Sequence, residues 1–468
     1  MSRYDSDSAS GPSHGPSRRG FLKLAGGAAA VAGLTTTLGS DLLAYAAARD
    51  ERALPAPNSG RPISLTMWNP YGAADLPIYK RWIQSYQRAY PNVTIKLVTL
   101  PWAAHWAKLQ AAVEAGSGPD IDLMHHDIYG QYYDAGLMVP YPESLFPLSQ
   151  MKQEYDLRGQ LASDGKMYIF PIGPTLGMIY YNTEIWRSAG LTTKDIPTTW
   201  DDLGRVAQHL TVRKNGVVKR YGFNLGAIST ATGFLHDFVP DPYYQQGVYM
   251  FSADGRKALF GNAQMVKAIQ THQSFFTTYK VASYSGQDGV TQFGNGVNAM
   301  TWCYPWLPSY LTSSAPKIKA GAFPLPNYTG AATGPYGRGD VAARFGVMTS
   351  ASPAKRETAF HFLHWLFMTG NRVTTALTYA NFEGALPAYK PAQSRATTVG
   401  LDVINKVKDR AVFLGDFPQA TQDALDKAIQ EIELTGVSPT TALAPAVQTT
   451  NRALLFRPYL FTERETKL

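Results

Sequence analysis

Two spacings of apolar residues alternate between residues 63 and 124. Apolar side chains occupy every second position in 63–67 and in 93–97, and a third strand is predicted at 121–124. Between these segments they recur three or four positions apart in 78–90 and 106–113, which predicts two helices, the second ending at Gly116. Strand, helix, strand, helix, strand is typical of an open parallel sheet, whose ligands bind beyond the carboxyl ends of its strands.

A second α/β unit follows the same logic. Residues 178–181 form an apolar strand, and Thr199 with Asp202 forms a capping box before a helix whose apolar face runs from Leu203 to Leu210. A strand is predicted at 345–348, and an amphipathic helix at 425–432 ends near Gly436. Two α/β units in one chain predict an α/β protein of two lobes, with a cleft between them.

Composition and charge narrow the class of protein. The 468 residues are 45% hydrophobic and 17% charged, as in globular proteins. The formal net charge is +8, but the densest basic cluster surrounds an Asn-Gly turn at 213–220 and predicts an exposed hairpin, so no nucleic-acid partner is expected. The single cysteine, Cys303, excludes an internal disulfide, and its distance from the N-terminus excludes a lipoprotein-type anchor.

The N-terminus has the pattern of an export signal. Arg18 and Arg19 are followed by Phe-Leu-Lys, an apolar run at 24–38 and a small-residue stretch at 44–48. The adjacent arginines indicate the twin-arginine type, a route that carries folded proteins. The apolar run is shorter than the roughly 20 residues that span a bilayer, which favours a cleaved signal over a retained anchor. We therefore predict a signal at 1–48, a flexible leader at 49–62, and a working protein outside the cytoplasm, either periplasmic or at the cell surface.

Several segments resemble one family when taken in order. They are YPNVTIKLVTLPWAAHWAKLQAAVEAGSGPDIDLM, DGKMYIFPIGPTLGMIYYN, PTTWDDL, FGNGVNAMTWCYPW and ASPAKRETAFHFLHWLF. Together they resemble the bacterial extracellular solute-binding proteins of the sugar-binding family, which are receptors of ATP-driven (ABC) importers. The match runs from about Ile63 to the C-terminal helices.

The resemblance implies a maltose-binding-protein-like, type II periplasmic-binding-protein fold. The chain would cross between lobes near 172–174, 320–323 and 380–383. Lobe I would comprise 63–172 and 323–380, lobe II would comprise 173–322 and 381–455, and 456–468 would form a tail. The implied protein is a monomer that closes by a hinge motion on a carbohydrate, presents it to a membrane permease, needs no cofactor and catalyses no reaction.

Candidate ligand-binding residues follow the predicted strands. Sugars are recognised by aromatic planes together with hydrogen-bonding side chains. The first strand is followed by Trp68, Asn69 and Tyr71, and the third by His126 and Asp127. Trp68 and Tyr71 are equally well explained as a cover over the core of their own lobe. Strand-like alternation after 298–300 would point Trp302, Tyr304 and Trp306 to one side, where the alternative is a buried aromatic cluster.

The resemblance assigns roles to some of these residues and adds others. Trp306 matches a sugar-stacking aromatic, and Asp127 matches an acceptor of sugar hydroxyls, although Ile128 and Met124 replace a ligand-binding arginine and tryptophan. Thr175 stands at a near-hinge position that carries a glutamate in the family. Further implied contacts are Ser229 and Thr230 in a second-lobe loop, Asp340 and Arg344 in a cleft-facing loop, and Phe417.

Two other classes of protein remain open. A metal-binding receptor would use His125, His126 and Asp127, the helical pair His361 and His364, or, for ferric iron, adjacent tyrosines such as Tyr180-Tyr181. A secreted carbohydrate-active enzyme would need two carboxylates roughly 5 to 9 Å apart, and Asp127 has no partner by motif. G-x-S-x-G occurs only at Gly11–Gly15, inside the predicted signal and not after a strand, and no G-x-G-x-x-G or Walker motif is present. The alternatives to a sugar receptor are therefore such an enzyme, or a receptor for a polyamine or ferric iron.

Overall fold

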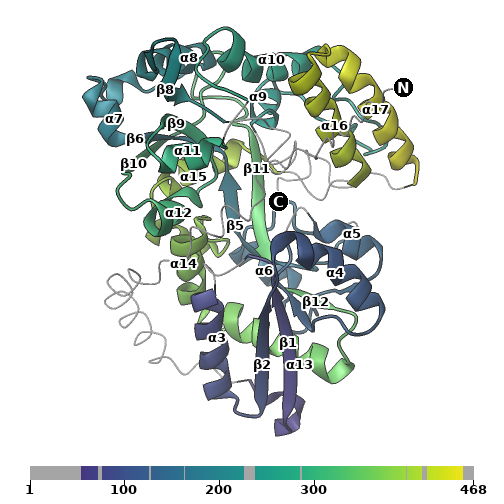
Figure 1. Cartoon of the computed structure of the whole chain (residues 1–468). Helices are drawn as coiled ribbons and strands as arrows, with labels where there is room; N and C mark the ends of the chain where they lie inside the picture. The colour runs from purple at the N-terminus through teal and green to yellow at the C-terminus, as the bar shows by residue number, and fades with distance from the viewer. Residues whose placement is uncertain are drawn as a thin grey trace, which may run out of the picture.

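The computed structural model describes residues 54–71, 76–125, 128–162, 164–225, 238–284, 287–396, 398–413 and 419–456. The predicted signal at 1–48 lies outside these residues. The chain forms two α/β lobes connected by strands that run from one to the other (Figure 1). We call the part built on the first sheet lobe I and the part built on the second sheet lobe II.

The sheet of lobe I confirms the predicted strand–helix alternation. Its strands β1 and β2 pair in parallel, with Ile63 opposite Val93, and β3 lies parallel on the other side of β1. The third strand is shorter than predicted because only Ile121 and Asp122 pair. The strand order is β2 (Val93–Thr99), β1 (Ile63–Asn69), β3 (Ile121–Asp122), β12 (Gly346–Met348) and β4 (Met138–Val139).

Helices cover this sheet with their apolar faces. On α3 (Leu76–Ala89) the residues that recur at helical spacing, Ile78, Trp82 and Ile83, are all buried in the lobe I core. Burying one such side chain contributes roughly 1.5–3 kcal/mol, so this stripe fixes how α3 lies on the sheet. The other helices of the lobe are α4 (Trp102–Glu114), α5 (Tyr129–Asp134), α6 (Leu148–Glu154), α13 (Pro353–Phe367) and α14 (Arg372–Glu383).

The sheet of lobe II is mixed. Its strand order is β10 (Ala320–Phe323), β6 (Met178–Asn182), β9 (Asn298–Cys303), β8 (Val217–Phe223) and β7 (Val212–Lys214). The predicted hairpin is β7–β8, and both residues of its turn, Asn215 and Gly216, have positive φ. The predicted capping box of Thr199 and Asp202 begins α8. The helices are α7 (Thr183–Ser188), α8 (Trp200–Leu210), α11 (Gly289–Gly294), α12 (Leu307–Ser314) and α15 (Leu401–Val407).

A third sheet connects the lobes. It consists of β13 (Val412–Phe413), β11 (Arg338–Arg344) and β5 (Phe170–Leu176), and β11 runs antiparallel to β5 (Figure 1). The sequence predicts that Asp340 and Arg344 lie in a loop and that the chain crosses between lobes at 320–323. The structure instead extends residues 338–344 as a strand, and 320–323 form β10 at the edge of the lobe II sheet. Pairing with β5 supplies the hydrogen bonds that turn an apparent loop sequence into a strand.

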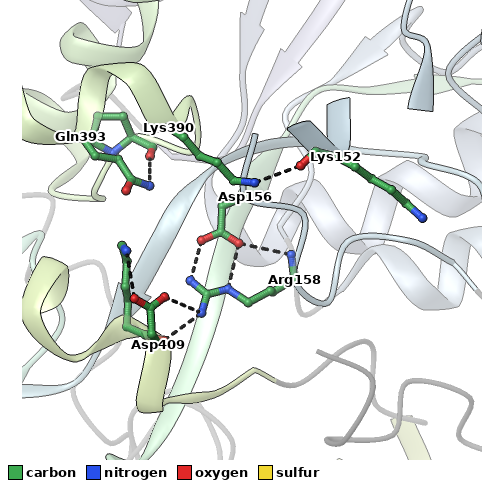
Figure 2. Close-up of polar contacts among 8 residues, drawn as sticks. Lys152, Asp156, Arg158, Lys390, Gln393 and Asp409 are labelled. Carbon is green, nitrogen blue, oxygen red and sulfur yellow. Dashed lines mark hydrogen bonds and ion pairs between the residues drawn. The ribbon is translucent and has the colours of Figure 1, made fainter. Parts of the chain in front are cut away.

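A polar junction ties lobe I to the segment that returns toward lobe II (Figure 2). Arg158 binds Asp156 through two hydrogen bonds, Nε–Oδ1 at 2.9 Å and Nη2–Oδ2 at 2.6 Å. The same guanidinium donates to the carbonyl of Lys408 at 2.8 Å and lies 3.9 Å from the ring centroid of Phe413. Short 3₁₀ helices, η5 (Lys390–Arg395) and η6 (Lys408–Arg410), shape this segment.

The last helices form a separate apolar cluster with part of lobe II. The predicted helix near 425–432 is α16, and the positive φ of Gly436, 72°, ends it. The cluster is formed by α9 (Pro240–Tyr244), α10 (Ala263–Thr277), α16 (Gln419–Thr435) and α17 (Pro439–Phe456). Among the residues described, none of the helices combines the length and apolar character that crossing a membrane requires.

Candidate ligand-binding site

The aromatic residues at the end of β9 differ in exposure. Trp302 is 9% exposed, Tyr304 is half-buried, and Trp306 is 39% exposed. Because β9 ends at Cys303, the predicted alternation does not continue through Trp306, which instead caps α12. The rings of Trp302 and Tyr304 still meet edge to face, with centroids 5.0 Å apart. Ring contact therefore joins Trp302 and Tyr304, whereas Trp306 is partly exposed to solvent.

The position of Trp306 is fixed by its backbone. Gly384, which ends α14 with a φ of 69°, lies against it so closely that a Cβ there would stand 1.8 Å from the carbonyl oxygen of Pro305. Only glycine fits this contact. The start of α12 is thereby held against the end of α14, where the two lobes meet in Figure 1.

A buried carboxylate organises the lobe II aromatics. Asp241, 1% exposed, accepts hydrogen bonds from the indole Nε1 of Trp302 and from the backbone N–H of Arg338, each 2.8 Å long. The Arg338 guanidinium in turn donates to the hydroxyl of Tyr304 at 3.0 Å. Gly177 leaves room for the Trp302 ring, because a Cβ there would stand 2.4 Å from Nε1. The contacts explain the burial of Trp302, which matches the alternative of a structural cluster.

In lobe I the predicted residues surround Tyr71. Its hydroxyl donates to the carbonyl of Met124 at 2.9 Å, and its backbone N–H donates to Oδ1 of Asn69 at 2.9 Å. Asn69 itself is fully buried and shapes this loop. The Arg344 guanidinium lies 4.0 Å from the centroid of the Tyr71 ring. Trp68 is half-buried and packs on the lobe I core, edge to face with His105.

A buried histidine–aspartate pair lies beneath these residues. His105 Nε2 and Asp122 Oδ2 are 3.0 Å apart, and both side chains are fully buried. Burial raises the pKa of Asp122, and the hydrogen bond from His105 opposes that rise. The pair joins α4 to β3 under the carboxyl end of the sheet, which is the edge that carries Trp68 and Tyr71.

The remaining predicted residues are placed only in part. Thr175 is the one residue of β5 that is not fully buried, and it pairs across the ladder with Asp340 of β11. His126, Asp127, Ser229, Thr230 and Phe417 lie outside the described residues. Their contact with ligand stays a prediction.

The metal alternative finds no support in the part of the chain described. There, no group of three or more His, Cys, Asp or Glu side chains could hold a metal ion. The helical histidine His361 is instead a core residue, with Nδ1 2.7 Å from the hydroxyl of Tyr86 and Nε2 3.1 Å from the carbonyl of Pro55. It ties the leader to α3 and α13.

Two lobes joined by β5, β11 and the Arg158 junction define a two-lobed fold of the type II periplasmic-binding-protein class, which confirms the predicted fold class. The chain belongs to the bacterial extracellular solute-binding proteins, whose family model matches residues 69–372.

Relatives of known name and structure agree with this class. A putative binding protein of Brucella abortus (strain 2308) is 24% identical over 330 residues, which are 68% of this chain and 74% of the relative. The maltodextrin-binding protein MdxE of Bacillus subtilis (strain 168) is 25% identical over 290 residues, 57% of this chain and 63% of that protein. The maltose/maltodextrin-binding domain of Bdellovibrio bacteriovorus, solved with maltotriose, has a TM-score of 0.69 at 18% identity, covering 84% of this chain and 100% of that domain.

Sequence reasoning missed the residues that orient the aromatics. Asp241 lies 61 positions from Trp302 and 97 from Arg338. No local pattern marks such contacts, because they form only when α9, β9 and β11 are brought together by the fold. The one available signal is chemical: a charged residue between two prolines, or at either end of a strand, needs a partner once it is buried.

Proposed function

We propose that this protein is an extracytoplasmic receptor that captures a carbohydrate between its two lobes and delivers it to the permease of an ABC importer. Family membership supports the receptor role, and a relative and a structural neighbour that bind maltodextrin support the class of ligand. We place the site between the lobe II aromatics at the start of β11 and the lobe I loop around Tyr71 at its end, along the crossing strands β5 and β11.

The observation that carries the proposal is the exposure of Trp306. Among the tryptophans whose side-chain burial is described, it is the one ring classed as exposed. A large aromatic ring that is held at a fixed backbone position and partly open to solvent offers a flat apolar face on which a ligand can stack. A sugar ring has an apolar face that stacks on such a plane, while its hydroxyl edge hydrogen-bonds to groups such as Thr175 and Asp127.

The ligand is identified by thermal shift. Purified protein is heated with a panel of mono- and oligosaccharides, with spermidine and ferric iron as controls. A ligand that binds the folded state raises the midpoint, and 100 times its Kd adds about 2.7 kcal/mol to the free energy of unfolding. Chromatography of the sugar after incubation separates a receptor, which returns it unchanged, from a carbohydrate-active enzyme, which consumes it.

The role of Trp306 is tested with the sugar so identified. We expect Trp306→Ala to weaken binding by about 1–3 kcal/mol, because the stacking plane and its buried apolar area are lost. Phe456→Ala is the matched control, since Phe456 is 91% exposed at the end of α17. Calorimetry that gives the same Kd for Trp306→Ala and the control would remove Trp306 from the site.

We also propose the organisation that the sequence predicts around this fold. A twin-arginine signal at 1–48 would be removed on export, and the mature monomer would act in the periplasm or at the cell surface. The predicted bounds are 63–172 and 323–380 for lobe I and 173–322 and 381–455 for lobe II, and the packing of Phe323 and Leu325 in the lobe II core moves the second boundary beyond residue 325. Neither a cofactor nor nucleic acid takes part in the proposed cycle, in which ligand closes the hinge and the closed form is read by the permease.

A further inference from the structure

Strand β11 is anchored in both lobes. At its start, the N–H of Arg338 binds the buried carboxylate of Asp241 in lobe II. At its end, the chain turns through Phe345, whose φ is 62°, and continues directly as β12 of the lobe I sheet. The strand spans about 20 Å between these points. It is therefore a rigid connection whose two ends move with different lobes.

An arginine stands at each end of this strand, and each contacts a tyrosine of the nearer lobe. Arg338, 3% exposed, donates to the hydroxyl of Tyr304 at 3.0 Å. Arg344, 6% exposed, stacks over the ring of Tyr71 at 4.0 Å. Both tyrosines are half-buried, and both are candidate ligand-binding residues.

The geometry leaves each tyrosine little freedom. The Tyr304 ring packs edge to face on Trp302, whose indole Asp241 holds, so its ring and its hydroxyl are both fixed. The Tyr71 hydroxyl and backbone are held by Met124 and Asn69, and Arg344 covers one ring face. A buried guanidinium is costly unless it is well bound, and an apolar residue would fill the same space more cheaply. The arginines therefore orient the two tyrosine rings in addition to packing against them.

We propose that Arg338 and Arg344 are positioning residues that hold Tyr304 of lobe II and Tyr71 of lobe I in their ligand-binding orientations. Because both arginines belong to β11, the two aromatic groups are tied to the strand that connects the lobes. During a hinge motion each tyrosine then moves with its own lobe, and its ring does not rotate relative to that lobe. This inference rests on the proposed function, since it assigns the tyrosines to that site.

The test compares loss of the guanidinium with its conservative replacement. With the sugar identified above, Arg338→Met should raise Kd about tenfold, because a hydrogen bond from a charged donor is lost. Arg338→Lys keeps a charged donor and should recover most of this loss. Arg344→Lys keeps the charge but loses the planar group that stacks on Tyr71, so it should also raise Kd. The matched control is Arg372→Met, which removes a guanidinium stacked on Tyr389 and paired with Glu154 away from these tyrosines.

Two readouts separate positioning from simple stabilisation. In a double-mutant cycle, Arg338→Met with Tyr304→Phe should bind no more weakly than Tyr304→Phe alone, since the two residues act through one contact. Without ligand, 3-fluorotyrosine at residue 304 should show a changed ¹⁹F shift in Arg338→Met and an unchanged one in Arg372→Met.

Each outcome has one meaning. An unchanged ¹⁹F shift in Arg338→Met, or a Kd that changes no more than in Arg372→Met, would overturn the inference. Wild-type protein that binds no sugar of the panel, with the ¹⁹F shift still dependent on Arg338, would overturn the proposed function and the ligand role of Tyr304. In that case the contact between Arg338 and Tyr304 would stand as structural only.

Discussion

At the scale of single residues, one buried carboxylate separates the aromatics of lobe II. Trp302 is buried, Tyr304 is half-buried and Trp306 is exposed. What separates them is the end of β9 at Cys303 and the carboxylate of Asp241, 61 residues from Trp302. Residue types are local information, whereas the partner that orients a side chain comes from a distant segment.

Buried histidines give a second residue-scale consequence. Burial lowers the pKa of His361 to about 4 and that of His272 to about 3, against 6.5 for the unperturbed group. The unfolded chain therefore binds more protons than the folded one once the pH falls below about 6.5. The stability that the two neutral histidines contribute is fully present above that pH. It is lost as the pH falls toward 4 for His361 and toward 3 for His272.

We expect the urea midpoint to fall between pH 6.5 and 5, before most carboxylates titrate. Each histidine contributes at most about 1.4 kcal/mol per pH unit, and His361 less because solvent screens part of it. His361→Gln should flatten this dependence, whereas His209→Gln, at an exposed position, should leave it as in the wild type. A midpoint that is constant from pH 7.5 to 5 would contradict the assignment.

At the scale of elements, local pattern predicts the parts that fold on local terms. Alternation predicts β1 and β2, helical spacing predicts α3 and α4, and the capping box of Thr199 starts α8. Strand β11 escapes prediction because Arg338, Gly339 and Asp340 are typical of a loop. Its extended form depends on pairing with β5, more than 160 positions earlier in the chain.

The junction around Arg158 makes an element-scale prediction (Figure 2). Asp156 is 6% exposed, so removing its guanidinium partner leaves a carboxylate poorly solvated. We expect Arg158→Met to lower the free energy of unfolding by roughly 2–4 kcal/mol, since the paired hydrogen bonds and the contact with Phe413 are lost together.

The control for Arg158 is an ion pair of similar N–O distance whose side chains are exposed to solvent. Arg205 and Asp202 are 2.7 Å apart, but their side chains are 65% and 39% exposed, so Arg205→Met should change stability little. Urea unfolding of both variants checks the comparison. Equal losses for Arg158→Met and Arg205→Met would show that the junction does not hold the lobe I segment to η6.

At the scale of the whole molecule, the two-lobed plan follows from the order of α/β units, and the predicted crossing near 172–174 falls within β5, one of the strands that connect the lobes. Residues 320–323 are predicted to cross as well, yet they form β10 of the lobe II sheet with Phe323 in the lobe II core, and the connection is made by β11. Burial against the lobe II sheet makes this segment an edge strand. The local sequence at 320–323 fits a crossing between lobes or an edge strand equally well, so no local pattern distinguishes the two.

The same long-range construction bears on how the protein would be exported. Contacts such as Asp241 with Arg338, 97 positions apart, form only when most of the chain is present, and the lone Cys303 is buried and needs no oxidising compartment. Export of the already folded chain is what the proposed twin-arginine signal would provide.

We therefore expect Arg18→Lys with Arg19→Lys to stop export, because the paired planar guanidinium groups are the recognised feature and lysine does not reproduce them. The variant should remain in the cytoplasm at its full length, folded and able to bind the sugar. Arg3→Lys, outside the motif, should be exported like the wild type. Fractionation with mass measurement of the N-terminus reads both results. Mature protein outside the cytoplasm at the wild-type level in the double variant would rule out this route.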